Sequence, residues 1–472
     1  MNQGYRHAAC LGILFILFTL LVSGRAYAEL YEGPPDLEEL AMGGGGLTGG
    51  GLSFIDGDPF VRFQIQPDIG IGKVGFGLGF VLLYNPEAGE GENQILAEDA
   101  EYWDNPSTMV RAVRYVRYAH PRDPFYARLG ELNFVTIGRG LIMSGYANYG
   151  RRGMSLNLRT ESRRIGVESI VNDLVNPRIF GGRLFIRPLQ GIKTVSILSG
   201  LELGATYLTD IKPDIIPDDY ATGQGDSIDE DPLIALSVDV GFPLIESDLF
   251  RLDLYDELAF LNTQSSLKHL AESEPPSGNA IGIGLTFPSS LFKFEYRTFN
   301  EGFVPTVFDY SYQASAVDSA PVFLGLGPDV DKGKARYGYF SMFAWQPIPM
   351  LHLLGAFEDY NISYPKLYVG ITESGIVQKM AFRAFYAKRD LGEPDSGYPD
   401  APGSEDPSIF EDLFRLDGKS ALIVRVEYEL YRPIVVAIVR EFRFRHREDA
   451  DGVTDFETIQ KTTIEVGLNL QF

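Results

Sequence analysis

The sequence predicts an all-β protein, a transmembrane antiparallel up-and-down β-barrel of about 18 strands, within a range of roughly 16–20. Two patterns predict this fold class. Segments in which apolar and polar residues alternate recur along the chain, and after residue 28 no apolar stretch is long enough for a membrane-spanning helix, which needs about 20 residues. The composition agrees, because 25 Tyr, 32 Phe and 51 Gly suit strands, interfacial aromatic residues and turns.

The first 28 residues have the organisation of a signal peptide. A basic start at Arg6 precedes the 12 apolar residues Leu11–Val22, and Ala26-Tyr27-Ala28 supplies a small-x-small cleavage motif. Cleavage after this motif would also remove Cys10, the only cysteine. We therefore expect a mature chain without disulfides or thiolate metal ligands.

The mature chain divides by composition into residues 29–59 and residues 60–472. Residues 29–59 contain the Gly-rich run Gly43–Gly51, so we expect either a flexible periplasmic lead or a small plug that enters the lumen. Residues 60–472 carry the alternating pattern and are expected to form the barrel. Within them, Phe60–Ile71 fits an extra strand or a periplasmic lead-in equally well.

The C-terminal segment shows the strictest alternation. One face holds Ile464, Val466, Leu468, Leu470 and Phe472, and polar residues occupy the other. A strand between lipid and water needs this pattern, because a charge at the lipid midplane costs about 2–4 kcal/mol. Arg114 falls on the otherwise apolar face of residues 110–118, and we expect a β-bulge or an interfacial position there.

Charged residues on the polar faces of the strands are the candidate lining of a lumen. They are Asp239, Arg251, Asp253, Glu257, Lys293, Glu295, Arg297, Arg425, Glu427, Glu429, Glu441, Arg443, Arg445 and Glu465. Side chains alone leave the interior of so wide a barrel unfilled, which favours a water-filled pore. In a narrower barrel, the same basic and acidic residues would pair between neighbouring strands and close the interior.

Most of the net charge of −23 lies in three of the six long connections, all of which fall on the outer side when counted back from a periplasmic C-terminus. Residues 86–107, 209–232 and 389–417 carry −7 each. Such a rim would attract cations, or bind divalent cations that bridge to lipopolysaccharide phosphates, or simply stay solvated. We expect no cofactor other than such a divalent cation.

Three further connections have distinct compositions. Residues 301–333 begin with an apolar stretch and are expected to fold inward as a constriction or to pack on the rim. Residues 138–152 are basic and are expected to pair with the acidic loops or with lipid phosphates. Candidate metal ligands at calcium-like spacing are Asp449, Asp451, Asp455 and Glu457, with an ordinary hairpin tip as the alternative.

The terminal strand and the overall alternation resemble those of bacterial outer-membrane porin-like barrels. Asp123–Gly130 resembles stretches of large barrels of this uncharacterised type, and the likeness covers residues 60–472 as architecture. The resemblance implies an integral location in the outer membrane of a Gram-negative (diderm) bacterium, in contact with lipid and lipopolysaccharide. It also implies that the barrel assembly machinery recognises Phe472, with Leu470 and Leu468 in the same signal.

No nucleotide loop, Cys/His cluster or basic nucleic-acid patch is recognisable, and no histidine lies in a hydrolase-like motif, so we expect neither an enzyme nor a nucleic-acid partner. We expect a monomeric or homotrimeric pore for passive diffusion of small polar solutes, with a cation bias. The alternative is a structural or surface-interaction barrel that presents acidic outer loops without an open pore.

Overall fold

The computed structural model describes most of residues 47–469. Outside the description lie residues 1–46, 56, 87–94, 97–111, 120–122, 133, 149–150, 161, 163, 192–197, 213–231, 248, 263–275, 301–302, 310–311, 313–335, 362, 389–390, 393–408, 417–419, 449–453 and 470–472. The predicted signal peptide, most of the acidic loops, Leu470 and Phe472 fall in these segments.

The described chain consists almost entirely of strands. The first part forms β1 (Leu47–Ile55), β2 (Asp58–Ile65), β3 (Asp68–Ile71), β4 (Val74–Leu78), β5 (Phe80–Tyr84), β6 (Ile95–Leu96), β7 (Val113–Tyr118), β8 (Phe125–Gly130), β9 (Val135–Ile137), β10 (Met143–Tyr146), β11 (Gly153–Arg159), β12 (Ile165–Val171), β13 (Ile179–Ile186) and β14 (Glu202–Asp210). The second part forms β15 (Leu233–Glu246), β16 (Arg251–Asn262), β17 (Ser277–Phe287), β18 (Ser290–Phe299), β19 (Arg336–Ile348), β20 (Leu351–Tyr360), β21 (Ser363–Ser374), β22 (Met380–Lys388), β23 (Ser420–Tyr431), β24 (Ile434–Glu448) and β25 (Thr454–Asn469). Two short helices are described, the 3-10 helix η2 (Leu198–Gly200) and α5 (Ile409–Leu413).

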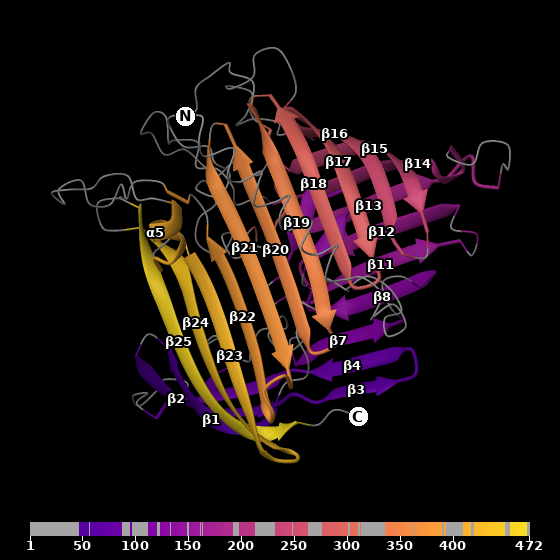
Figure 1. Cartoon of the computed structure of the whole chain (residues 1–472). Coiled ribbons are helices and arrows are strands. Elements are labelled where there is room, and N and C mark those ends of the chain that lie inside the picture. The colour runs from indigo at the N-terminus through magenta and orange to yellow at the C-terminus, as the bar shows by residue number, and fades with distance from the viewer. Residues whose placement is uncertain are drawn as a thin grey trace.

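The main sheet closes on itself as an antiparallel barrel (Figure 1). β25 pairs with β24 on one side and with β1 on the other, and β1 also pairs with β2. Among the described residues this sheet contains 23 strands. The number of labelled strands exceeds the number of times the chain crosses the barrel wall. For example, β2 and β3 are successive parts of one arm of a hairpin, and β4 and β5 are successive parts of the other arm. The predicted number of crossings therefore stays a prediction, whereas Phe60–Ile71 belongs to the sheet.

Strand β1 corrects the predicted start of the barrel at residue 60. Leu47–Ile55 lies in the segment expected to be a lead or a plug, yet it forms the strand that closes the barrel against β25. A Cβ atom on Gly49 would lie 2.1 Å from the carbonyl oxygen of Val466, and one on Gly51 would lie 2.1 Å from that of Ile464. The Gly-rich run is therefore a closely packed strand, because residues without a Cβ allow this approach.

The barrel is apolar outside and charged inside. On β18, Phe294 and Tyr296 are 49% and 40% exposed, whereas Glu295 and Arg297 are 0% exposed. The other strands repeat this contrast, with exposed Val238, Ile281, Ile283, Ile438, Ile464 and Val466 against buried Asp239, Glu257, Glu427 and Glu465. A wall of this polarity is that of a transmembrane barrel, whose outer face meets hydrocarbon. Among the described residues, no helix is long and apolar enough to cross a membrane.

The pattern break at Arg114 is a β-bulge. The register between β4 and β7 shifts there, since Gly77 pairs with Tyr115 while the next residue, Leu78, pairs with Val113. The extra residue leaves the alternation locally, and the Arg114 guanidinium lies 5.5 Å from the centroid of the Tyr115 ring. One of the two predicted explanations is therefore confirmed.

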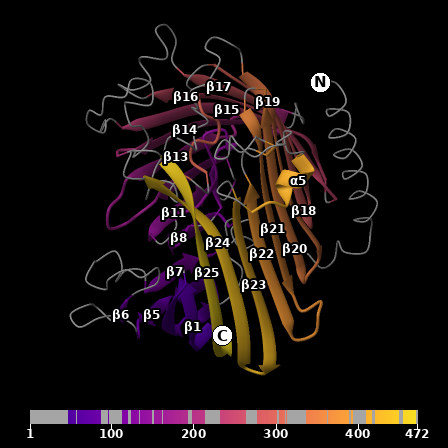
Figure 2. The same ribbon diagram turned by 90° about the vertical axis from the view of Figure 1, so that its left-hand side faces the viewer.

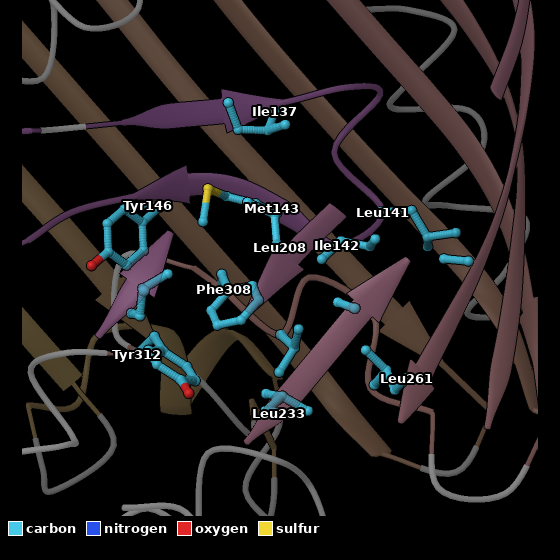
Figure 3. Packing of buried hydrophobic residues seen from close by; sticks show 14 of the residues in the cluster. Ile137, Leu141, Ile142, Met143, Tyr146, Leu208, Leu233, Leu261, Phe308 and Tyr312 are labelled. Atoms are coloured by element: carbon cyan, nitrogen blue, oxygen red, sulfur yellow. The ribbon is translucent and has the colours of Figure 1, made fainter. Parts of the chain in front are cut away.

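Two connections fold into the barrel and pack together there. The first plug loop, residues 131–152 between β8 and β11, contains the β9–β10 hairpin. The second plug loop, residues 300–312 between β18 and β19, lies beside it through a parallel bridge between Met143 and Phe308. Figure 3 shows their apolar side chains gathered with residues of the inner wall, such as Leu208, Leu233 and Leu261. The largest apolar cluster of the described residues thus lies inside the barrel.

Candidate functional site

The lumen and its plug form the candidate site. Backbone hydrogen bonds join the two plug loops: the Thr306 N–H donates to the Leu141 carbonyl oxygen at 2.7 Å, and the Phe308 N–H to that of Ile142 at 3.1 Å. In return, the Ser144 N–H donates to the Phe308 carbonyl oxygen at 3.2 Å. These hydrogen bonds join two segments that lie more than 150 residues apart in the sequence. The apolar start of residues 301–333 folds inward, as predicted.

Carboxylates of the barrel wall hold the tip of the first plug loop. The Gly138 N–H donates to Glu168 on β12 at 3.1 Å, and the Leu141 N–H donates to Glu257 on β16 at 2.9 Å. The second Glu257 oxygen accepts a hydrogen bond from the Ser237 hydroxyl at 2.7 Å. Glu257 is 1% exposed, so both of its oxygens are satisfied inside the protein.

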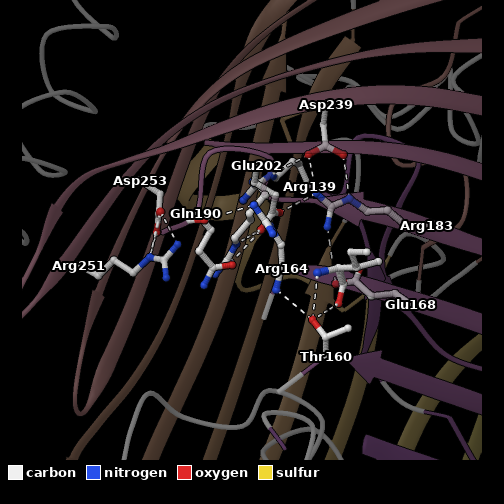
Figure 4. A network of polar contacts seen from close by, with 12 residues as sticks. Arg139, Thr160, Arg164, Glu168, Arg183, Gln190, Glu202, Asp239, Arg251 and Asp253 are labelled. Atoms are coloured by element: carbon white, nitrogen blue, oxygen red, sulfur yellow. Dashed lines mark hydrogen bonds and ion pairs between the residues drawn. The ribbon is translucent and has the colours of Figure 1, made fainter. Parts of the chain in front are cut away.

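Arg139 brings the charge of the tip into the same network (Figure 4). Its guanidinium lies 3.1 Å from Glu202 and 3.3 Å from Asp239. The same two carboxylates bind Arg183, which contacts both Asp239 oxygens, at 2.8 and 2.6 Å, and Glu202 at 2.8 Å. Arg187 adds a contact of 2.9 Å to Glu202. Charge-assisted bonds of this kind are the strong ones, and here they tie the plug to β13, β14 and β15.

The inner wall leaves space for this arginine. A Cβ atom on Gly241 would lie 2.0 Å from a terminal nitrogen of Arg139. The Arg139 guanidinium also lies 5.2 Å from the centroid of the Tyr255 ring. Gly241 thus clears the position that the guanidinium occupies against the wall.

A charged row on β18 supports the second plug loop. Glu295 lies 2.7 Å from the Lys293 ammonium and accepts hydrogen bonds from the Arg297 Nε–H at 2.8 Å and from the Tyr255 hydroxyl at 2.8 Å. Arg297 also donates to the Thr306 hydroxyl at 2.9 Å. The Lys293 ammonium donates to the Arg139 carbonyl oxygen, so one strand contacts both loops.

Two tyrosines of the plug, Tyr146 and Tyr312, are buried outside the membrane-spanning strands. Burial raises the pKa of Tyr146 well above its usual 10.0. Burial also raises the pKa of Tyr312, and the Asp210 carboxylate, which accepts its hydroxyl at 2.9 Å, adds to that rise. Both phenols therefore stay protonated over the physiological range.

The opposite part of the wall carries a second charged group around β23 and β25. Arg425 lies 2.5 Å from Glu427 and 3.2 Å from Glu465, which also lies 3.6 Å from Arg62 on β2. Arg383 on β22 is within electrostatic range of Arg425 and Glu427. Basic and acidic side chains thus alternate across the closing strands of the barrel.

The structure brings only some of the sequence-predicted lining residues together. Asp239, Glu257, Lys293, Glu295 and Arg297 surround the plug, and Arg425, Glu427 and Glu465 form the second group. Arg251 and Asp253 pair with each other at 2.8 Å, and Glu441 lies 3.9 Å from Lys461. Glu429 pairs with Arg432 at the β23–β24 turn, at 3.4 Å.

The remaining sequence-predicted residues lie at the ends of the last two strands. Arg443 and Arg445 belong to β24, and Asp455 and Glu457 to β25, but their side chains lie outside the described residues. Asp449 and Asp451 are outside them altogether, and no metal-binding group occurs in the part of the chain that the structure describes. Leu468 is 38% exposed on the outer face, as an apolar residue of the terminal strand should be.

For Arg139, the prediction that the basic residues of 138–152 pair with the acidic loops or with lipid phosphates is wrong. Arg139 pairs with wall carboxylates rather than with the acidic outer loops or lipid phosphates, and Arg152 lies 3.4 Å from Glu131 and donates to the Val113 carbonyl oxygen at 2.5 Å. The loop folds inward because buried carboxylates require cationic or N–H partners, which this loop supplies.

Sequence reasoning also missed Arg183, Glu168 and Glu202. All three lie on alternating strands, so the polar-face rule that found Asp239 would have found them as well. Nothing in the alternation indicates that Arg139, in a loop, would complete their network.

A crevice remains between the plug and strands β19–β21. It has a cavity volume of about 70 Å³, and its apolar walls include Phe134, Phe340, Met342 and Tyr368. Charged Asp309, Glu358 and Lys366 line the same crevice, the last two 3.2 Å apart. Apolar surface and an ion pair therefore face one small space in the lumen.

The overall chain trace is similar to solved outer-membrane barrels. Pseudomonas aeruginosa OprD matches at 10% identity and a TM-score of 0.28, over 88% of this chain and 92% of that chain. The FrpB iron transporter of Neisseria meningitidis matches at 9% identity and a TM-score of 0.35, over 90% and 82%. A Rhodopseudomonas blastica porin, a triple mutant, matches at 8% identity and a TM-score of 0.27, over 88% and 97%.

No protein-family profile matches the chain, and no curated protein matches its sequence. The three superpositions are loose, so they say nothing about what this chain transports or binds.

Proposed function

We propose that this chain is an integral outer-membrane pore through which small polar solutes diffuse passively, and that its two plug loops set the width of the pore. One observation carries the proposal: a closed antiparallel sheet has an apolar outer face and a charged inner face. A charged inner wall suits an aqueous solute path, whereas the apolar face suits lipid.

The plug supports a narrow pore rather than a wide one. Its two loops occupy the inner side of the wall from β12 to β20, with Ile170, Leu208, Ala259 and Tyr360 in their apolar cluster. We propose that solutes pass beside the plug, along the charged group that includes Arg425 and Glu465. The crevice at Phe340 and Lys366 would then be a place where a passing solute touches the wall.

A cation bias is part of the proposal and rests on the outer loops. Residues 86–107, 209–232 and 389–417 contribute −7 each to a net charge of −23. Loops of one charge sign at a pore mouth raise the local concentration of oppositely charged solutes. The same carboxylates are proposed to bind divalent cations that bridge to lipopolysaccharide.

Recording from planar bilayers tests the pore. Detergent-refolded chain is added to one side, and heat-modifiable electrophoretic mobility confirms that the barrel is folded. We expect stable ohmic current steps. The pore is refuted if the folded chain inserts into the bilayer and passes no current.

The alternative is a barrel that presents its acidic loops and does not conduct. The close packing of the plug favours a non-conducting barrel, since Leu141, Met143 and Phe308 are 0% exposed. A silent bilayer, together with no current from variants that release the plug, would establish this second function.

The assembly partners and the oligomeric state are also proposals. The barrel assembly machinery would recognise the apolar row that includes Leu468 and ends at Phe472. A homotrimer would require contact between lipid-facing walls of neighbouring copies. Native-mass measurement in detergent separates monomer from trimer.

A further inference from the structure

Helix α5 lies on the lipid-facing side of the barrel wall. On β22, Phe385 and Ala387 pack inward with Tyr368 and with Phe134 of the plug. Since side chains alternate along a strand, the neighbouring Tyr386 and Lys388 point outward. Figures 1 and 2 show α5 near β22.

Both outward side chains bind the α5 segment. The Tyr386 hydroxyl donates to the Leu413 carbonyl oxygen at 2.7 Å, and the Lys388 ammonium lies 3.2 Å from the Asp412 carboxylate. Asp412 also accepts the Gly392 N–H at 2.8 Å. The segment therefore folds back over the outside of the wall and is fixed to it at several points.

The ion pair beneath α5 is closed off from solvent. The side chains of Lys388 and Asp412 are 0% and 4% exposed. Lys388 also donates to the Arg415 carbonyl oxygen at 3.1 Å and to the Ser420 hydroxyl at 3.2 Å. A charge on a lipid-facing wall is stable only when it is paired and satisfied, and the α5 segment supplies most of these partners.

The opposite side of the segment is strongly apolar and exposed. Ile409, Phe410, Phe414 and Leu416 are 53%, 73%, 81% and 44% exposed. They stand out within a connection whose residues 389–417 otherwise carry −7. Rings of this kind, next to a polar backbone and a satisfied charge, are typical of the boundary between acyl chains and headgroups.

We propose that the α5 segment is an interfacial anchor that inserts Phe410 and Phe414 into the outer leaflet of the membrane. Lipid is the occupant that the structure favours, because the patch is continuous with a wall whose exposed residues, such as Val369 and Ile438, already face hydrocarbon. The anchor goes beyond the proposed pore and does not depend on conductance. It would fix the depth and tilt of the barrel on its β22–β23 side.

Tryptophan fluorescence tests the anchor. The chain has 2 tryptophans, Trp103 and Trp345, which are replaced by phenylalanine. Phe414→Trp then reports on the patch in the folded barrel in phosphatidylcholine vesicles. We expect blue-shifted emission, quenching by lipids brominated near the acyl carbonyl, and iodide quenching several-fold below that of the urea-unfolded chain.

Two controls fix the scale of the measurement. Ile438→Trp lies on the lipid-facing wall and gives the response of full contact with acyl chains, while Phe410→Trp serves as a second reporter if Phe414→Trp prevents folding. Emission and iodide quenching equal to those of the unfolded chain would overturn the anchor. Blue-shifted emission that brominated lipids do not quench would also overturn the anchor, because it would indicate that the tryptophan contacts protein rather than lipid.

Discussion

Arg139 connects the plug to three charged residues of the barrel wall. Its guanidinium contacts Glu202 and Asp239, while its carbonyl oxygen accepts the Lys293 ammonium. Arg183 binds the same carboxylates and would remain after Arg139 is removed, so the wall itself stays neutralised. Removal of the Arg139 side chain should therefore weaken the docking of the plug more than it lowers the stability of the barrel.

Arg139→Ala is expected to weaken docking of the first plug loop by about 1.5–3 kcal/mol, the range for hydrogen bonds to charged groups. Single-channel recording should then show a larger mean conductance, or frequent transitions to a wider state. Arg251→Ala is the matched control, because Arg251 also forms an ion pair, with Asp253 at 2.8 Å, whereas the plug loops are held by other residues. Equal conductance in both variants and the parent would show that the plug does not set the pore width.

Tyr312 gives the plug a dependence on alkaline pH. Its pKa is raised in the folded chain, so its contribution to plug stability is complete below the unfolded value near 10.0 and is lost as pH rises through the folded value. We expect the conductance to increase above about pH 10. Tyr312→Phe cannot ionise and should shift or flatten this rise. An identical alkaline profile in the variant would contradict the assignment.

At the scale of elements, β1 holds the barrel closed through two pairings. It pairs with β25 over Leu47–Ile55 and with β2 over Gly49–Ile55. The seam depends on glycine at alternate positions, since Gly49 and Gly51 face carbonyl oxygens of β25 while Gly50 faces β2. A side chain is therefore costly at some positions of the run and tolerated at others.

Gly49→Ala should destabilise the barrel by about 1–3 kcal/mol, as overpacking typically does. Its Cβ would lie 2.1 Å from a backbone oxygen, which cannot move as the end of a side chain can. Gly50→Ala is the control, with its nearest contact at 3.3 Å. The free energy of unfolding of both variants is measured by urea titration in vesicles, with heat-modifiable electrophoretic mobility as the readout of the folded fraction. Equal losses in the two variants would refute a steric role for this seam.

The sequence predicts which segments form strands and which face each side chain takes, but it does not predict which side chains meet across the lumen. Period-two alternation placed Glu295 and Arg297 on one face and Phe294 on the other, as observed. The same rule missed β1, because glycines carry no side chain that alternates. It also gave no sign that Arg139 would reach Asp239, since which residues meet across a lumen depends on closure and loop path rather than on local pattern.

For the whole molecule, the placement of charge separates the wall from the rim. Wall charges among the described residues are largely paired, as in Arg183 with Asp239 or Arg425 with Glu465. The surplus lies in the connections expected on the outer side, since residues 86–107, 209–232 and 389–417 carry −7 each. Paired wall charges give little net field, so selectivity between cations and anions should come from the rim.

A cation bias that depends on salt follows from this arrangement. In a KCl gradient near 0.1 M, where the Debye length is about 10 Å, the reversal potential should show a K⁺ permeability several-fold above that of Cl⁻. Near 1 M, where the length is about 3 Å, the ratio should fall toward one. Asp→Asn replacement of the Asp residues in 213–232, which spares the plug partner Asp210, should lower the ratio at low salt, while Asp253→Asn on the wall should leave it largely unchanged. A pore that prefers Cl⁻, or a ratio that salt leaves constant, would place the selectivity in the lumen, on groups such as Arg383 and Arg425, and not in the acidic rim.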